Sequence, residues 1–224
     1  MRSPHELHRS NRFHCTMSRA VVSLALATLA SCNSGPARVA QPYISAGAAG
    51  SAAMDEYDTN GDGAVAGDEL EKAPSLKAAL KNLDKDGDSR VTAAEVTERV
   101  QAWQSQNTGL TNVRCLVVMD GRPLVGADVV FEPESFLGDE IETAVGVADS
   151  SGTVSPVIPK DKRPTPQTPP GLRLGLYKIK ISKIVGGKET VPARYNAETT
   201  LGQEVSADDP SMKQSQIVFK LQRG

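Results

Sequence analysis

Residues 58 to 69 read Asp58-Thr59-Asn60-Gly61-Asp62-Gly63-Ala64-Val65-Ala66-Gly67-Asp68-Glu69. Oxygen-bearing side chains stand at positions 1, 3, 5 and 12 of this stretch, with a glycine at position 6 and a β-branched residue at position 8. Alternate side chains of a tightly turned chain converge on one point, and glycine permits the left-handed backbone that reverses the chain. A set of oxygen ligands suits Ca²⁺. The stretch predicts a calcium-binding loop whose ligands are Asp58, Asn60, Asp62, the carbonyl of Ala64 and Glu69.

A second stretch of the same design reads Asp84-Lys85-Asp86-Gly87-Asp88-Ser89-Arg90-Val91-Thr92-Ala93-Ala94-Glu95. Its predicted ligands are Asp84, Asp86, Asp88, the carbonyl of Arg90, Thr92 directly or through water, and Glu95. Both stretches resemble the loop of the EF-hand family, which implies two Ca²⁺ sites. The second loop has more carboxylates than the first, but Ser89 replaces the glycine at position 6, at a cost of about 1–2 kcal/mol. The relative affinity of the two loops therefore stays open.

The residues around the two loops have the apolar spacing of helices. The stripes are Leu76, Leu80 and Leu83 before the second loop, and Val96, Val100 and Trp103 after it. We expect Ser75 to cap the first of these helices and Pro74 to end the helix before it. Val65 and Val91 are expected to pair as a short β bridge. The loops start 84 minus 58, or 26, residues apart. This spacing resembles bacterial extracytoplasmic EF-hands and dockerins more than calcium sensors. The alternative is a calcium-free helical hairpin with mutually repelling acidic turns.

The N-terminal region predicts export and lipid attachment. Residues 19–32 run from an arginine through about ten apolar or small residues to a cysteine, which is typical of a signal peptide and too short to span a bilayer. The end of this segment, Leu29-Ala30-Ser31-Cys32, resembles the lipobox of bacterial lipoproteins. The resemblance implies removal of residues 1–31, acylation of Cys32 and an extracytoplasmic protein anchored to a bacterial membrane. An ordinary secretory signal is the alternative, and Met17 is a more natural start than Met1.

From Asn112 onward the pattern changes to short alternating apolar runs. Seven strands are expected, at 113–119, 128–132, 143–148, 153–158, 172–182, 201–205 and 216–221. Strands without intervening helices favour a β-sandwich. The stretches Asp120-Gly121-Arg122-Pro123 and Gly175-Leu176-Tyr177-Lys178-Ile179 resemble the carboxypeptidase regulatory-like, or transthyretin-like, domain. Pro192-Ala193-Arg194-Tyr195-Asn196 is similar to the form of that domain in lipoproteins of planctomycete-type bacteria. These motifs imply a fold and no chemistry.

The expected fold class is therefore α+β and multidomain, with a helical EF-hand pair followed by a seven-stranded transthyretin-like sandwich. The expected boundaries are 1–31 for the signal peptide, 32–53 for a lipid-anchored flexible tether, 54–107 for the EF-hand pair and 108–224 for the sandwich. The tether is rich in Ala, Gly and Ser, as flexible linkers are. A short helix in its Ala-rich end is the alternative.

The residue inventory argues against an enzyme. All three histidines precede residue 15, so the exported chain would lack a His-based triad, dyad or zinc site. Acids such as Glu132 and Glu134, with Asp139 and Glu140, are interpreted as a solvated loop rather than a glycosidase pair. The formal net charge of −2 gives no reason to expect nucleic-acid binding. Cys115 is expected to be a small buried residue, and residues 159–170 a basic, proline-rich spacer.

The sequence thus predicts a calcium-binding, membrane-anchored surface lipoprotein with a structural or adhesive role. Calcium would act as a constitutive clamp, because extracellular sites of this kind bind at about 10⁻⁴ to 10⁻³ M. The expected partner is the lipid membrane, reached through acylated Cys32. The alternative function is a calcium-dependent module that docks an envelope protein or glycan.

Overall fold

The computed structural model describes residues 39–106, 108–209, 212 and 217–224. These residues belong to one compact unit that spans Ala37–Gly224. The expected signal peptide, the acylated Cys32 and the first part of the expected tether lie outside the described residues. Within the described ranges, no helix has both the length and the apolar character needed to cross a bilayer.

The N-terminal part of the unit is helical and contains both predicted loops. Its elements are α1 (Ala46–Tyr57), β1 (Ala64–Val65), α2 (Asp68–Lys72), α3 (Pro74–Leu83), β2 (Val91–Thr92) and α4 (Ala93–Ser105). The first loop (residues 58–69) lies between α1 and α2, and the second loop (residues 84–95) lies between α3 and α4. Strands β1 and β2 pair antiparallel, with Val65 opposite Val91, which confirms the predicted bridge. The pairing fixes the two loops side by side.

The expectation of a flexible tether over residues 32–53 is wrong from Ala46 onward, because α1 begins there. One face of α1 is buried, and it consists of the small residues Ala49, Gly50 and Ala53 followed by Tyr57 at the end of the helix. A Cβ atom added at Gly50 would lie 2.3 Å from the carbonyl oxygen of Ala93 in α4. The small residues that suggested a tether are therefore the residues that let α1 approach α4 closely.

Helices α2 and α3 meet at Pro74. Helix α2 ends at Lys72, as the proline requires, and Pro74 is the first residue of α3. The expectation that Ser75 caps α3 is wrong, because Ala73 is the N-cap residue and Ser75 lies inside the helix, fully buried. Its hydroxyl bonds to a distant carboxylate instead. The apolar stripes are confirmed, since Leu76, Leu83, Val96, Val100 and Trp103 are fully buried and Leu80 is partly buried against the same core.

The C-terminal part contains two larger β-sheets. Its strands are β3 (Cys115–Met119), β4 (Arg122–Pro123), β5 (Asp128–Pro133), β6 (Ala144–Val147), β7 (Thr153–Val154), β8 (Gly175–Ser182), β11 (Gly202–Val205) and β12 (Ile217–Leu221). One sheet has the order β11-β8-β5-β6, and the other has the order β12-β3-β4 with β7 also paired to β3. A small hairpin joins β9 (Ile184–Val185) to β10 (Lys188–Glu189). The remaining elements are the 3₁₀ turns η1 (Ser135–Leu137), η2 (Lys160–Lys162) and η3 (Ala193–Tyr195).

The two sheets share an apolar core. The ring of Phe131 in β5 lies 6.3 Å from that of Phe219 in β12 and 5.8 Å from that of Tyr177 in β8, both edge to face. Alternation along β8 is confirmed, because Ile179 and Ile181 are buried while Lys178, between Tyr177 and Ile179, is only partly buried. Cys115 is buried in β3, as expected, and burial raises the pKa of its thiol to about 12. Helices and several sheets together confirm the α+β class.

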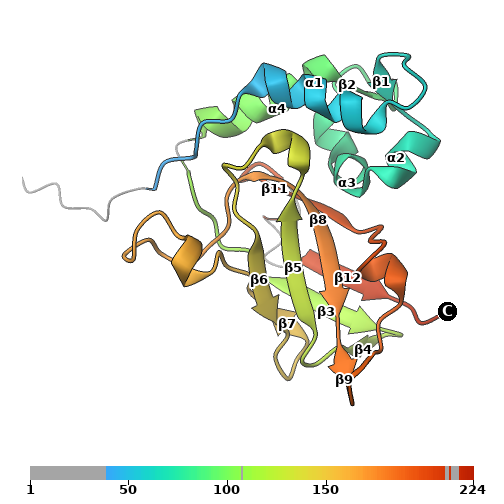
Figure 1. The fold of residues 1–224 in the computed structure, drawn as a ribbon, viewed down its shortest axis with the longest axis vertical. Helices are drawn as coiled ribbons and strands as arrows, with labels where there is room; N and C mark the ends of the chain where they lie inside the picture. Colours follow the sequence, from blue (N-terminus) through green and yellow to red (C-terminus); the bar gives the residue numbers. More distant parts are fainter. Residues whose placement is uncertain (1–38, 107, 210–211, 213–216) are drawn as a thin grey trace, which may run out of the picture. The chain divides into compact units, whose positions relative to one another are not determined.

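The helical part packs on the sheet that contains β8 and β11 (Figure 1). Helix α3 contacts both of these strands, and α1 contacts η1, which directly follows β5. The approach at Gly202 in β11 is tight, since a Cβ atom there would lie 2.0 Å from the carbonyl oxygen of Pro74. The two predicted loops therefore connect helices that pack on the sheet side of the molecule.

Candidate metal-binding loops

At position 1 of each loop, an aspartate organises the turn. Asp58 accepts the backbone N–H groups of positions 4 and 6 at 2.8 and 2.9 Å, and Asp84 accepts the same two groups at 2.6 and 2.9 Å. Position 6 has positive φ in both loops, 88° at Gly63 and 63° at Ser89. The predicted left-handed backbone at Ser89 is thus confirmed.

Positions 3 and 5 repeat between the loops as well. Asn60 accepts the N–H group of position 5 at 2.8 Å, and Asp86 does the same at 3.2 Å. At position 5, Asp62 and Asp88 accept the N–H group of position 7 at 3.1 and 2.8 Å. These bonds hold the side chains at 1, 3 and 5 toward the inside of each turn. In the second loop, carboxylate oxygens of Asp84, Asp86 and Asp88 lie within 4.8 Å of one another.

At position 12 a glutamate closes each loop. Glu69 accepts the N–H groups of positions 2 and 9 at 2.9 and 3.2 Å, and Glu95 accepts the same two groups, both at 2.9 Å. Glu69 is 7% exposed. Its burial acts to raise the pKa of its carboxyl group, but hydrogen bonds from Ala66, Thr59 and Asn60 outweigh that effect, so the pKa lies below its ordinary value. Glu69 is therefore held as the anion, the form that binds a cation.

Three predicted ligands have further roles in the structure. The hydroxyl of Thr92 donates to Glu95 at 2.9 Å and accepts the N–H group of Glu95 at 3.3 Å, so it forms a capping box at the start of α4. The predicted ligands Ala64 and Arg90 stand two residues after the position-5 aspartates and donate their N–H groups to them. Every ligand predicted in residues 58–95 thus lies in one of the two loops.

An ion pair between the loops was not predicted. The Arg90 guanidinium of the second loop lies 2.8 Å from Oδ1 of Asp62 in the first loop. Both side chains are partly exposed, which limits the strength of the pair. The guanidinium nevertheless places a positive charge on a predicted ligand of the first loop alone. The two loops, similar in sequence, are therefore unequal in electrostatics.

Two further carboxylates bind, from the sheet side, the helices that flank the loops. The interpretation of Glu134 as part of a solvated loop is wrong, because its side chain is fully buried beneath the helices. Burial raises the pKa of its carboxyl group, against the lowering effects of a hydrogen bond from Ser75 and the charge of Lys178. Glu204 in β11 is equally buried and forms an ion pair with Arg99 of α4. Sequence patterns gave no signal for either contact.

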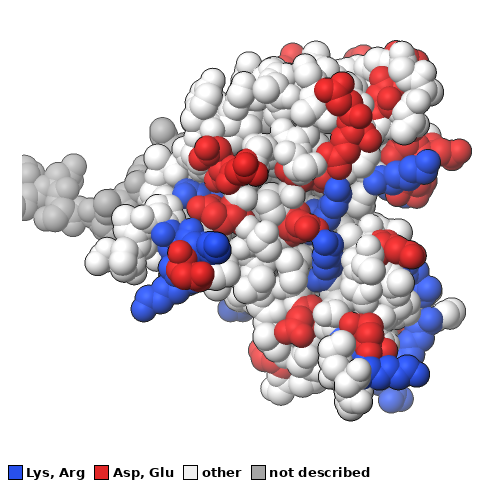
Figure 2. All heavy atoms as spheres, in the orientation of Figure 1, with Lys and Arg blue, Asp and Glu red and all other residues white. Residues whose placement is uncertain are grey.

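Acidic side chains gather over the α1 and α2 end of the helical part (Figure 2). The chain matches no protein-family model, no curated protein and no solved structure. The fold and the loops therefore define only a class, an α+β protein with two paired, acidic twelve-residue loops.

Proposed function

We propose that each of the two loops binds one Ca²⁺ ion, as an EF-hand pair does. The observation that carries the proposal is the shared hydrogen-bond pattern. In both loops the same positions, 1, 3, 5 and 12, turn their side-chain oxygens inward to accept the same backbone N–H groups. Because two different sequences form the same pattern, the pattern is a general property of this type of loop and not a peculiarity of one turn. Oxygen ligands in flexible loops are what Ca²⁺ prefers.

The role of the bound calcium is structural in this proposal. The helices rest on a sheet through buried contacts, and the bridge between β1 and β2 ties the loops together. Calcium neutralises the acids that the two loops concentrate, so its binding free energy adds to the stability of the folded state. We further propose that the two sheets form the transthyretin-like sandwich, that residues 1–31 are removed, and that acylated Cys32 anchors the protein to a bacterial membrane.

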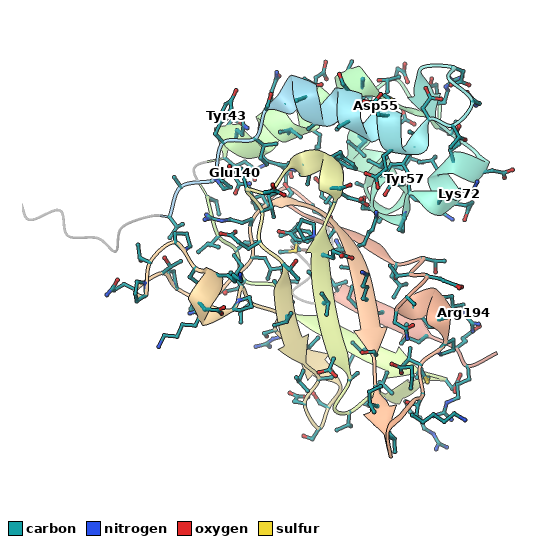
Figure 3. The ribbon with its side chains drawn as sticks, in the orientation of Figure 1. Tyr43, Asp55, Tyr57, Lys72, Glu140 and Arg194 are labelled. Atoms are coloured by element: carbon teal, nitrogen blue, oxygen red, sulfur yellow. The ribbon has the colours of Figure 1, made fainter. Side chains whose placement is uncertain are left out.

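Docking of an envelope protein or glycan is the second candidate function. It is favoured by a hollow of about 490 Å³ between the start of α1 and η1. The hollow is lined mainly by apolar atoms, with Ala52 and Phe136 among its walls. Tyr43 at its rim is 79% exposed and is labelled in Figure 3. An exposed aromatic ring beside an apolar hollow is a common feature of recognition surfaces.

Calorimetric titration of the purified full-length chain with calcium tests the first proposal. We expect two sites near 10⁻⁴ to 10⁻³ M, with helical circular dichroism lost on chelation. Glu69→Gln and Glu95→Gln should each remove one site and leave the other. Absence of calcium binding would overturn the proposal. Micromolar binding that leaves the fold intact and exposes apolar surface, measured by dye fluorescence, would favour the docking function instead.

The proposed anchor has its own test. The full-length chain expressed in a bacterium that processes lipoproteins should fractionate with membranes, and mass spectrometry should find a diacylglycerol on Cys32. The Cys32→Ser variant should carry no diacylglycerol, because serine lacks the thiol to which the lipid attaches. A membrane-associated parent chain without a diacylglycerol on Cys32 would contradict lipid anchoring.

A further inference from the structure

Glu134 joins the helical part to the sheet at the first loop. Its side chain, which follows β5, accepts the hydroxyl of Tyr57 at 2.9 Å and that of Ser75 at 2.5 Å. The ammonium group of Lys178 lies 3.1 Å away and supplies the opposite charge. Three partners satisfy a carboxylate that would otherwise be too costly to bury. Figure 3 labels Tyr57 at the end of α1, on the side of the helices that faces the sheet.

Glu204 likewise joins the helical part to the sheet, at the second loop. One of its carboxylate oxygens accepts the side-chain N–H group of Asn82 at 2.7 Å. The other accepts Nε of Arg99 at 2.5 Å and the indole N–H of Trp103 at 2.9 Å. The Glu204 side chain is fully buried. Both carboxylates thus bind α3, through Ser75 and Asn82, and each also binds a second helix, α1 for Glu134 and α4 for Glu204.

The positions of these donors relative to the loops form a pattern. Tyr57 immediately precedes the first loop, and Ser75 lies just past α2, which leaves that loop. Asn82 is two residues before the second loop, and Arg99 is four residues after it. Each carboxylate therefore holds the chain on both sides of one loop, Glu134 around the first and Glu204 around the second.

We infer that Glu134 and Glu204 are positioning residues that set the calcium affinity of the first and second loop, respectively. The inference rests on the proposed calcium function. A calcium ion needs ligands from position 1 and position 12 at once, so the two ends of the loop must be held at a fixed separation. A carboxylate that already fixes both flanks removes part of the ordering cost of binding. Linkage requires the reverse effect as well, so calcium strengthens the contacts between helices and sheet.

The test measures each loop separately. In the full-length chain, Glu95→Gln leaves the first loop as the only calcium site, and Glu69→Gln leaves the second. Tyr57→Phe removes the hydroxyl that reaches Glu134 and keeps the ring against Phe136 and Lys178. Asn82→Ala removes one bond to Glu204. Tyr43→Phe and Asn112→Ala are matched controls at exposed residues.

We expect Tyr57→Phe to weaken calcium binding by the first loop about 3- to 10-fold and to leave the second loop within about 1.5-fold. Asn82→Ala should have the converse effect. The loop selectivity separates positioning from general destabilisation, which would weaken both loops alike. Fluorescence of Trp103, the only tryptophan, reports whether the Glu204 contact is intact. If a variant does not fold, Ser75→Ala and Trp103→Phe remove other bonds to the same two carboxylates.

Calcium binding that is unchanged in both variants, or weakened equally in both loops, would overturn this inference and leave the proposed function standing. A parent chain that binds no calcium would overturn both. The two failures are distinguishable because the parent titration comes first.

Discussion

Position 6 has the same left-handed backbone conformation in both loops but a different residue in each. Gly63 adopts its φ of 88° without steric penalty, whereas Ser89 at 63° places a Cβ atom against the backbone. The second loop therefore carries strain that the first loop lacks. This strain partly offsets the calcium affinity that the extra carboxylate of the second loop adds.

Exchanging the two residues tests the strain. Ser89→Gly should raise the free energy of unfolding by about 0.5–1 kcal/mol, because relief of strain exceeds the greater flexibility of glycine in the unfolded chain. Gly63→Ser should lower it by about 1–2 kcal/mol. Urea unfolding of the calcium-free protein measures both changes. Equal destabilisation by the two substitutions would contradict the assignment of strain to Ser89.

The ion pair between Arg90 and Asp62 predicts an effect on calcium binding. Arg90→Ala should tighten binding by the first loop about 2- to 5-fold, because calcium then no longer competes with a guanidinium for Asp62. The measurement is a calcium titration in the Glu95→Gln background. Lys85→Ala removes the same charge from an exposed position of the second loop and is the control. An equal gain from Lys85→Ala would mean that net charge, and not the ion pair, sets the affinity.

The sequence allowed the loop residues to be predicted because ligands at positions 1, 3, 5 and 12 of one turn are neighbours in the chain. The same reasoning could not find Glu134, whose donors Tyr57 and Ser75 lie 77 and 59 residues away. A glutamate between a proline and a serine has the same local pattern whether buried or solvated.

At the scale of elements, the amino-acid composition of α1 led to a wrong prediction. Residues 46–53 consist of Ala, Gly and Ser, which suits a linker as well as a closely packed helix. These residues form a helix because α4 provides a surface against which the small residues of α1 pack closely. The two glycines of α1 differ in this respect. Gly50 faces Ala93 at close range, whereas a Cβ atom at Gly47 would meet nothing within 4 Å.

Alanine at these two positions should therefore act in opposite directions. Gly47→Ala should stabilise the protein by about 0.5–1 kcal/mol through helix propensity. Gly50→Ala should destabilise it by about 1–3 kcal/mol, because the new methyl group overlaps the Ala93 carbonyl and the Thr97 hydroxyl. Thermal unfolding followed by helical circular dichroism measures both. Stabilisation by both substitutions would mean that α1 does not pack on α4.

Strand positions were more predictable than strand pairing. Each of the seven expected strands overlaps an observed one, because period-two alternation is a local signal. The parallel pairing of β12 with β3, in which Ile217 faces Cys115, joins residues about a hundred positions apart and has no such signal. The hairpin of β9 and β10 did have a local sequence signal. Gly186-Gly187, both with positive φ, is a turn sequence between two short β-branched or polar runs.

At the scale of the whole molecule, the helical part and the sheets form one compact unit. Arg99 of α4 is central to this arrangement, because it binds Glu204 in β11 and both carboxylate oxygens of Asp208 beyond it, each at 2.8 Å. A buried guanidinium with two acidic partners is satisfied only when helix and sheet are in contact. Separation of the two parts would leave charges without partners, so we expect them to unfold together.

The Asp208 contact predicts how the stability of the whole unit depends on pH. Hydrogen bonds from Arg99 hold the pKa of Asp208 well below its usual range. Because the folded-state pKa lies below the unfolded one, the contact stabilises the protein fully at pH values above about 4, and this contribution is lost progressively as the pH falls toward the folded-state pKa. Asp208 is 52% exposed, so we expect the contribution at pH 7 to be only about 0.5–1 kcal/mol.

Asp208→Asn should lower the free energy of unfolding by that amount at pH 7 and by progressively less between pH 4 and pH 2. Urea titrations followed by Trp103 fluorescence measure the difference from the parent chain at each pH, without calcium in either sample. The other carboxylates are common to both proteins, so their contributions cancel in the difference. Asp161→Asn, at an exposed position in η2, is the control and should run parallel to the parent chain. A pH-independent difference for Asp208→Asn would mean that the side chain contributes through packing, and that its charge does not hold the helical part on the sheet.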